Sequence, residues 1–274
     1  MHDLDVAPRP AQMIDLGGRR LALTGSGRGL PTVLLETGLG AESADWEEVQ
    51  RGVERFAQVC RYDRAGRGAS DPAPGPRDAL AMVEELRALL RGAAIPGPYV
   101  LVGHSFGGLL MRLYAHRHGG EVAGLVLVDS MHEEQFDIFG PAFPPATESD
   151  PPALSEMRGF WTGGWRDPDS TSERIDLVAS IAQGRAIGSL GAIPLHVITA
   201  GTFLNNPLVP PARRAGLQGQ WETLQRRLLA LSSQATRSMS LRSGHFVQRD
   251  DPRIVIDAIA GMVARARKAA ADPG

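Results

Sequence analysis

The sequence has little of what marks several large classes of protein. It contains a single cysteine, Cys60, so no internal disulfide can form and a buried, inert thiol is expected. Its 29 basic and 31 acidic side chains leave a formal net charge of -2, which gives no case for nucleic acid as a partner. No apolar run approaches the roughly 18 residues of a membrane span, and the N-terminus has no apolar segment of the secretory kind. We therefore expect a soluble, cytoplasmic protein.

Motifs for metals and cofactors are also missing. No cluster of cysteines and histidines, and no His-Glu-x-x-His spacing, indicates a metal site. The glycine-rich stretch 25–29 lacks the Lys-Ser/Thr pair of a phosphate-binding loop, and the stretch 63–68 lacks the dinucleotide-binding glycine pattern. We expect neither a metal nor a cofactor.

Strands and helices are predicted to alternate along most of the 274 residues. Two apolar runs around Gly17-Gly18 indicate a strand pair within residues 11–25. Continuous apolar runs such as 122–128 suit parallel strands that are covered on both faces. Further strands are predicted at 31–36, 58–62, 98–102, 193–199 and 236–242. Helices are predicted at 44–56, at 77–91, from 109 onward and at 220–231. The last helix is predicted to begin at Pro252, with Asp251 as its N-cap. This order predicts an α/β fold with a mainly parallel central sheet flanked by helices.

Residues 131–191 interrupt this alternation. The segment is rich in proline and aromatic residues and holds one helix-like stretch near 172–183. It is too long for an ordinary connection, so we predict an inserted cap at 131–191 over a core made of 1–130 and 192–274. The alternative is an elaborate surface loop, in which the aromatic side chains would need another surface to cover them.

The most informative motif is Gly103-His104-Ser105-Phe106-Gly107-Gly108, which directly follows an apolar strand and precedes a helix-compatible segment. A serine at so sharp a strand-to-helix turn has strained backbone and holds its hydroxyl above the sheet. The glycines two positions before and after it must be small, and the helix directs its positive end at the serine. An ordinary glycine-rich turn is the alternative. The setting between strand and helix favours a reactive Ser105.

A neutral serine needs a base, and the base needs an orienting acid. Among the seven histidines, His245 follows the last predicted strand and precedes the last helix, where a loop reaches the carboxyl edge of the sheet. The others that we weighed occupy less suitable places: His2 is terminal, His104 lies inside the turn, His116 and His118 lie near a helix end, and His196 lies within a strand. His245 is therefore the predicted base.

Together these residues resemble the serine hydrolases of the α/β-hydrolase fold, from about Met13 to Ala264. The matching segments are the nucleophile turn 103–108, the loop 37–40 in the place of the family's oxyanion loop, the loop 62–71 and the histidine loop 244–246. The resemblance implies an oxyanion hole built from the backbone N–H groups of Leu39 and Phe106. Thr37 stands where the family usually has histidine.

The chain departs from the family at the catalytic acid. The family most often places this acid after the seventh strand, yet residues 199–211 contain no Asp or Glu. Asp129, at the end of the sixth predicted strand, preserves the order nucleophile, acid, histidine. Glu133 and Glu134 are the second choice, and a helix cap or hinge ion pair is the alternative role for Asp129. Glu36 ends a buried-type strand, so we expect it to pair with Arg64.

The sequence thus predicts a cofactor-independent serine hydrolase that cleaves a carboxylic ester through an acyl-enzyme. Its partner would be a small-molecule ester or lactone, which covers carboxylesterases and esterases of lactone or macrolide rings. Thioesterases and amidases use the same machinery. The aromatic cap favours a bulky or apolar substrate. The alternative is a small-molecule sensor or receptor on the same scaffold with slow or no turnover. No feature of the sequence specifies an oligomeric state.

Overall fold

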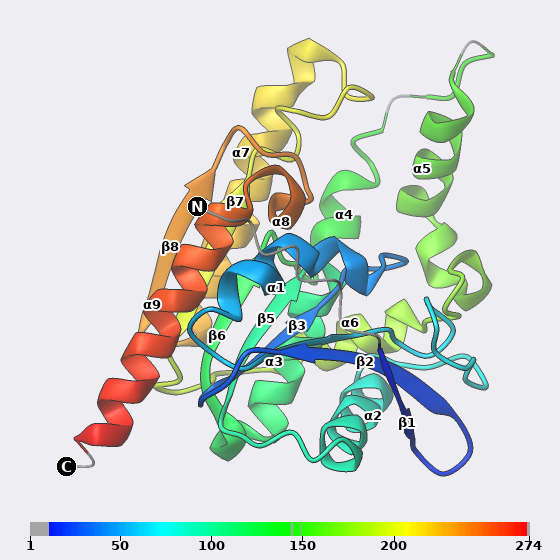
Figure 1. Cartoon of the computed structure of the whole chain (residues 1–274). Coiled ribbons are helices and arrows are strands. Elements are labelled where there is room, and N and C mark those ends of the chain that lie inside the picture. The colour runs from blue at the N-terminus through cyan, green and yellow to red at the C-terminus, as the bar shows by residue number, and fades with distance from the viewer. Residues whose placement is uncertain (1–10, 144, 149, 273–274) are drawn as a thin grey trace, which may run out of the picture.

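An eight-stranded sheet forms the centre of the computed structural model, which describes residues 11–143, 145–148 and 150–272 (Figure 1). Residues 1–10 of the predicted core range lie outside the described part. The strand order is β1-β2-β4-β3-β5-β6-β7-β8, with antiparallel pairing at β1–β2 and β2–β4 and parallel pairing from β4 to β8. The strands are β1 Gln12–Asp15, β2 Arg20–Ser26, β3 Thr32–Glu36, β4 Val59–Tyr62, β5 Tyr99–His104, β6 Val122–Val128, β7 Leu195–Ala200 and β8 Ala235–Ser240. The predicted α/β fold with a mainly parallel sheet is confirmed.

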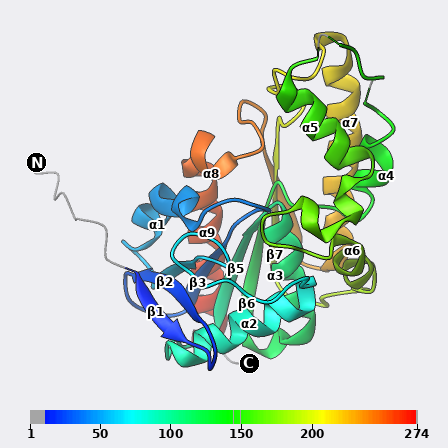
Figure 2. The same cartoon turned by 90° about the vertical axis from the view of Figure 1, so that its right-hand side faces the viewer.

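Helices cover both faces of the sheet. The helices α2, α3 and α6 lie on one face and α1 and α9 on the other, which Figure 2 shows from the side. The helices are α1 Glu47–Val53, α2 Ala79–Gly92, α3 Phe106–Arg117, α4 Gln135–Phe139, α5 Pro152–Thr162, α6 Leu177–Arg185, α7 Pro211–Arg227, α8 Val247–Asp250 and α9 Pro252–Ala271. Short 3-10 turns lie at Ser43–Trp46, Gly119–Glu121, Gly164–Arg166, Pro168–Ser170 and Leu228–Leu231.

The central strands are apolar along their whole length because both of their faces are buried. In β5, Leu101 packs with the cluster under α2 and α3, whereas Val100 and Val102 pack with the cluster under α1 and α9. All three side chains are completely buried. The side chains of a strand alternate between its faces, so a strand covered on both sides needs apolar residues at every position.

Two helix starts differ from the sequence-based expectation. The helix expected at 220–231 begins at Pro211 and continues to Arg227, before the 3-10 turn Leu228–Leu231. Its first turns are polar and small, so they carry no apolar periodicity that could reveal them. The helix-like stretch near 172–183 is helical only from Leu177, where the side chain of Asp176 accepts a hydrogen bond from the N–H of Ala179 at 2.8 Å.

The last helix begins where it was expected, but its start is stabilised differently. Asp251 occupies the N-cap position of α9, and it makes no side-chain cap bond to the helix. Its carboxylate instead accepts a hydrogen bond from the hydroxyl of Ser240 at 2.8 Å. The predicted N-cap position of Asp251 and the helix start at Pro252 are confirmed, although the carboxylate holds the end of β8 and does not bind the helix.

The segment between β6 and β7 contains α4, α5, α6 and two 3-10 turns. Helix α6 packs on α2 and α3, and the hydroxyl of its Ser180 accepts the N–H of Ala79 at 3.0 Å. Helices α4, α5 and α7 stand together above the sheet (Figure 2). Phe139 of α4 lies against Trp221 of α7, with ring centroids 5.9 Å apart. The raised layer therefore includes α7, which lies outside the range 131–191. No helix in the described part of the chain is long and apolar enough to cross a membrane.

Burial should make Cys60 chemically inert in the folded protein. The side chain is completely buried in β4, and burial raises the pKa of its thiol to about 12. An unfolded cysteine has a pKa of about 8.5, and the thiolate is the reactive form. At pH 8 we expect iodoacetamide to leave the native protein unmodified and to modify Cys60 fully in urea, as measured by intact mass. Rapid modification of the native protein would contradict this burial.

Candidate active site

Ser105 lies at the sharp turn between β5 and α3. Its backbone angles are φ 52° and ψ -121°, a conformation that is rare and strained for a residue with a side chain. A Cβ on Gly103 would lie 2.5 Å from the carbonyl oxygen of Gly107, and a Cβ on Gly107 would lie 2.4 Å from that of Thr37. Both glycines are therefore required by backbone contact, as the nucleophile-turn interpretation predicts.

His245 and Asp129 form a hydrogen-bonded pair beside this turn. Asp129 directly follows β6 and is completely buried, whereas the side chain of His245 is 34% exposed. Nδ1 of His245 lies 2.7 Å from Oδ2 of Asp129. A carboxylate that accepts this bond holds the proton on Nδ1, so that Nε2 stays available as an acceptor.

The backbone of His245 is held by the residue before the serine. Nε2 of His104 lies 2.8 Å from the carbonyl oxygen of His245, and their rings lie 4.6 Å apart between centroids. Since a carbonyl oxygen can only accept, Nε2 of His104 carries the proton and donates. Burial lowers the pKa of His104 well below its ordinary value, so this ring is neutral. His104 therefore supports the loop that carries His245 through a neutral, fully buried ring.

The carboxylate of Asp129 is surrounded by donors from three parts of the chain. Besides His245, it accepts the N–H of Ala200 at 3.0 Å, the indole N–H of Trp221 at 2.7 Å and the hydroxyl of Thr202. These bonds offset the cost of removing a carboxylate from water. They also fix both oxygens, so that Oδ2 faces the imidazole.

Thr202 and Trp221 are the site residues that sequence reasoning missed. Thr202 lies in the loop after β7, where the family more often places its acid, so a search of that loop for hydroxyl donors as well as acids could have found it. Trp221 lies on α7, and its 92-residue separation from Asp129 leaves no local signal.

Of the two residues predicted to form the oxyanion hole, Phe106 follows Ser105 in the chain, and Leu39 follows Gly38, which lies beside Ser105. Phe106 is the first residue of α3, where backbone N–H groups have no acceptor inside the helix. Leu39 follows Gly38, and a Cβ on Gly38 would lie 3.1 Å from the Cβ of Ser105. The parallel pairing of Glu36 with Gly103 brings these two chain segments together.

The other acids that we considered are engaged elsewhere. Glu133 pairs with the buried Arg112 at 2.6 Å, and Glu134 pairs with Arg227 at 2.6 Å. The expected pair of Glu36 with Arg64 is confirmed, with 2.6 Å between Oε1 and Nη1. Among the described residues, no group of three or more His, Cys, Asp and Glu side chains could hold a metal ion.

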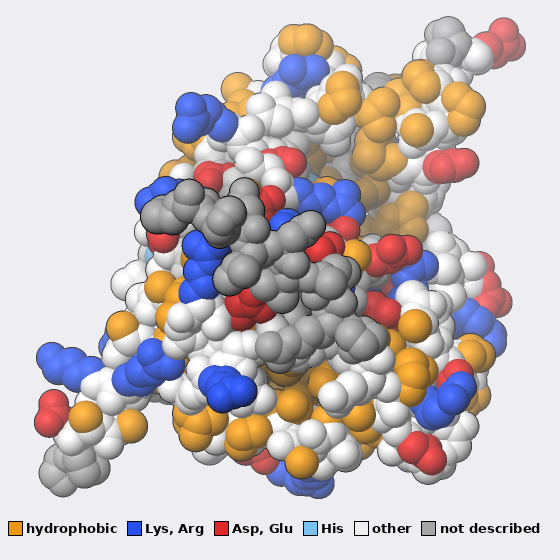
Figure 3. Space-filling view, viewed as in Figure 1, with side chains coloured by type: hydrophobic (Ala, Val, Ile, Leu, Met, Phe, Trp, Pro, Cys, Tyr) orange, Lys and Arg blue, Asp and Glu red, His pale blue; other side chains and the backbone are white. Residues whose placement is uncertain are grey.

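A cavity of about 270 Å³ opens onto Ser105 and His245. Its walls are mainly apolar and come from α4, α5, α7 and the loop after β7, with Arg213 and Asn206 among the polar exceptions. Apolar side chains gather over α5 at the upper right of Figure 3. The main apolar lining residues are Phe139, Phe143, Leu154, Met157, Trp161, Phe203, Leu208, Val209, Leu217 and Trp221. Ser105 and His245 therefore face a space suited to an apolar ligand.

Comparison with known proteins agrees with this geometry. A family model described as the alpha/beta hydrolase fold matches residues 31–163. The solved structure of a putative lipase from Acinetobacter baumannii superposes with a TM-score of 0.67 at 17% identity, over 94% of this chain and 92% of that one. The chain has the α/β-hydrolase fold. A second α/β-hydrolase-fold neighbour, a thermophilic esterase from Thermogutta terrifontis, has a TM-score of 0.62 at 18% identity, over 93% of this chain and 98% of that one.

The curated sequence relatives of this chain are matched at 24–38% identity, most of them over a short part of their own length. The uncharacterized protein YqjL of Bacillus subtilis is 25% identical over 232 residues, which is 82% of this chain and 80% of that protein. Several further curated relatives are matched over only 17–39% of their own length.

The close backbone contacts at the turn lead to a stability prediction. Gly107→Ala should lower the free energy of unfolding by about 1–3 kcal/mol, because its Cβ would overlap the carbonyl of Thr37. The matched control is Gly261→Ala in α9, where a Cβ meets nothing within 4 Å. This control should raise stability by about 0.5–1 kcal/mol. Urea unfolding followed by circular dichroism measures both, and equal effects would contradict the contact at the turn.

Proposed function

We propose that the protein is a serine hydrolase that cleaves carboxylic esters, with Ser105, His245 and Asp129 as its catalytic residues. The observation that carries this proposal is the 2.7 Å bond between Nδ1 of His245 and the buried Asp129. Ser105 and His245 line the same cavity. The lipase and the esterase among the structural neighbours support a hydrolase. The three residues support a serine hydrolase in particular.

The geometry supports acyl transfer in two steps. Nε2 of His245 takes the proton of the Ser105 hydroxyl while the serine oxygen attacks the ester carbon. The N–H groups of Phe106 and Leu39 stabilise the negative charge on the former carbonyl oxygen. When the tetrahedral intermediate collapses, the bond to the alcohol breaks and His245 returns the proton to the leaving oxygen. Asp129 stabilises the imidazolium formed in between.

Water then completes the cycle at the acyl-enzyme. His245 removes a proton from the water as its oxygen attacks the acyl carbon, and Ser105 leaves with that proton as the acid is released. The strained serine backbone contributes to this chemistry because it is maintained by the packing of Gly103 and Gly107, so the hydroxyl does not need to be repositioned in either step.

The lining of the cavity supports an ester with an apolar acyl or alkyl group. We assign residues 131–191 as a cap, and with α7 they supply most of the apolar wall. A carboxylesterase is favoured over a lactonase, because a cavity of this kind accepts a flexible chain and shows no feature that selects a ring.

Labelling and turnover of the purified protein test the proposal directly. We expect a fluorophosphonate probe to label the wild type and Ser105→Ala to abolish both labelling and hydrolysis of p-nitrophenyl esters. Asp129→Asn should lower kcat by on the order of 10³–10⁴-fold, because the imidazole loses its orienting acceptor. Circular dichroism of each variant is the folding control.

The two ways of failing are distinct. A wild type that is not labelled overturns the serine-hydrolase proposal. A wild type that is labelled but hydrolyses none of a panel of acyl esters and lactones supports the alternative of a small-molecule sensor or receptor.

A series of acyl chains tests the apolar cavity. From acetate to hexanoate, kcat/KM should rise by about threefold to fourfold per methylene, which corresponds to about 0.8 kcal/mol for each buried CH₂. Ala142 lines the cavity, so Ala142→Phe should abolish this rise while leaving acetate turnover within about twofold. A flat chain-length profile in the wild type would contradict an apolar acyl site.

A further inference from the structure

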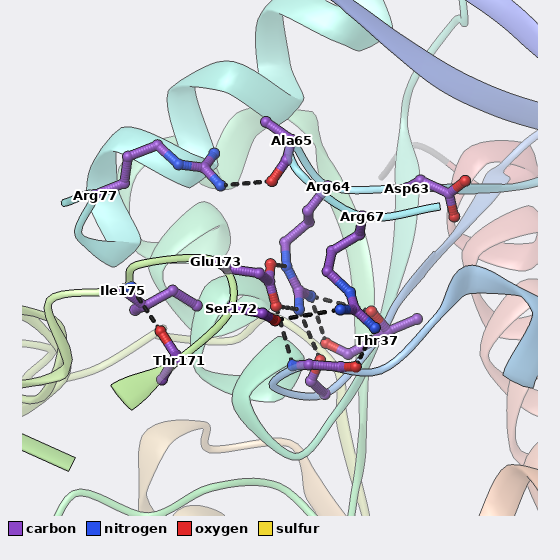
Figure 4. A network of polar contacts seen from close by, with 12 residues as sticks. Thr37, Asp63, Arg64, Ala65, Arg67, Arg77, Thr171, Ser172, Glu173 and Ile175 are labelled. Carbon is purple, nitrogen blue, oxygen red and sulfur yellow. Dashed lines mark hydrogen bonds and ion pairs between the residues drawn. The ribbon is translucent and has the colours of Figure 1, made fainter. Parts of the chain in front are cut away.

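A buried arginine connects the candidate oxyanion loop to the cap. Arg64 follows β4, is only 2% exposed, and directs its guanidinium between Thr37 and Glu173 (Figure 4). Nη1 donates to the carbonyl oxygen of Thr37 at 2.8 Å, and Nη2 donates to that of Gly38 at 2.7 Å. Nη1 also meets Glu36 at 2.6 Å. One side chain thus holds two successive carbonyls of the loop 37–40.

The bond to Gly38 orients the neighbouring N–H. The carbonyl of Gly38 and the N–H of Leu39 belong to the same peptide group, which is planar, with the two groups pointing in opposite directions. Since Arg64 holds the carbonyl on its own side, the N–H of Leu39 must face away from the guanidinium. The loop adjoins Ser105 at Gly38. The N–H of Ala41 also donates to this carbonyl, at the longer distance of 3.3 Å, so Arg64 supplies the shorter of the two bonds that set the direction of this candidate oxyanion donor.

Glu173 reaches the same loop from the cap. Its carboxylate accepts two bonds from Arg64, at 2.6 Å from Nε and 2.7 Å from Nη2. Its Oε1 also accepts the N–H of Gly40 at 3.0 Å. Arg67 adds a bond to the carbonyl of Gly40 and another to the hydroxyl of Ser172 at 3.2 Å (Figure 4). The cap turn around Glu173 thus binds the loop directly at Gly40. It also binds Arg64, which holds the loop at Thr37 and Gly38.

The charges of this cluster keep the Arg64–Glu173 pair ionised. Burial acts to raise the pKa of Glu173, but the adjacent Arg64 outweighs it and leaves that pKa below its ordinary value. Burial would lower the pKa of Arg64, and its two carboxylate partners raise it instead. Bidentate pairs of this kind are short and geometrically specific. The carboxylate of Glu173 consequently fixes the plane of the guanidinium.

We propose that Glu173, acting through Arg64, is a positioning residue for ester hydrolysis: it orients the Gly38–Leu39 peptide so that the N–H of Leu39 completes the oxyanion hole. This rests on the proposed function. Through Glu173, the cap would help to stabilise the transition state in addition to enclosing the substrate. An ion pair that served stability alone would have no effect on the reaction of folded molecules.

The test compares Glu173→Gln with the wild type, after titrating active sites with a fluorophosphonate so that only folded molecules are counted. Glutamine keeps the shape but loses the charge, and Arg64 stays paired with Glu36. We expect kcat to fall by about 10- to 100-fold while KM stays within about twofold, because loss of one well-placed oxyanion donor costs on the order of 10²–10³ in kcat.

A boronic acid inhibitor gives a second readout, because its adduct with the serine carries the negative charge of the tetrahedral intermediate. Its Ki should rise by about the same factor as kcat falls. Arg64→Lys keeps the charge but not the fork. It should show the same pattern, and it carries the test if Glu173→Gln does not fold. The matched control is Asp169→Asn, which removes an exposed pair with Arg174 that does not touch the loop; it should change neither kcat nor Ki.

The outcomes separate the proposals. If the wild type hydrolyses esters and Glu173→Gln keeps kcat within about twofold, or changes KM alone with unchanged boronate affinity, the positioning role is wrong. If the wild type itself neither hydrolyses esters nor reacts with the fluorophosphonate, the proposed function is wrong, and the positioning role is wrong with it.

Discussion

The buried carboxylate of Asp129 is the interaction on which the arrangement of the site depends. A carboxylate removed from water is costly unless donors surround it, and here the donors come from the end of β7, the loop after it, helix α7 and the histidine loop. These segments are far apart in the sequence. Each carboxylate oxygen has two donors, so loss of any one segment would remove a bond from the buried charge and raise the cost of burying it. The oxygen that Thr202 also binds holds Nδ1 of His245, which lines one cavity with Ser105.

A second buried ionic cluster holds the loop 37–40, which adjoins Ser105 at Gly38. Arg64 holds carbonyls of the loop that contains Leu39, and Glu173 joins that arginine to the cap. Both clusters fix backbone groups with charged side chains in a dry environment, where a partly satisfied network is expensive. Each cluster includes a member from the segments between β6 and β8: Trp221 from α7 in one, and Glu173 from the turn before α6 in the other. Both clusters are therefore complete only when these segments are docked.

Features governed by local rules could be predicted from the sequence. The strained turn at Ser105 follows from glycine spacing between a strand and a helix, and the pairing of Glu36 with Arg64 follows from the cost of a buried carboxylate beside a neighbouring loop. The choice of Asp129 and His245 follows from the order nucleophile, acid, histidine and from their places after β6 and β8, which end at the carboxyl edge of the sheet. That choice draws on the resemblance to the α/β-hydrolase fold as well as on the order of the strands.

Features that depend on packing at long range could not be predicted in this way. The first turns of α7 carry no apolar period, because their small and polar residues lie mostly at the surface. Trp221 lies within the helix expected at 220–231, but nothing near it in the sequence indicates a bond to Asp129, 92 residues away. Glu173 lies 109 residues from Arg64, and nothing in its own neighbourhood distinguishes it from other acids of the cap. Thr202 serves Asp129 as a donor in a loop that was searched only for acids. In each case the partner is specified by the fold and not by spacing along the chain.

The position of Trp221 places a constraint on how this site can vary. Its indole N–H binds Asp129 while its ring lines the cavity and packs with Phe139 and Phe203. A change at this position alters the acid as well as the substrate space. Leu154 and Met157 line the same cavity from α5, a helix without a fully buried residue, and make no contact with the acid. Substrate preference can therefore change through α5 at little cost to stability or chemistry, whereas the wall formed by α7 must keep a donor for the buried carboxylate.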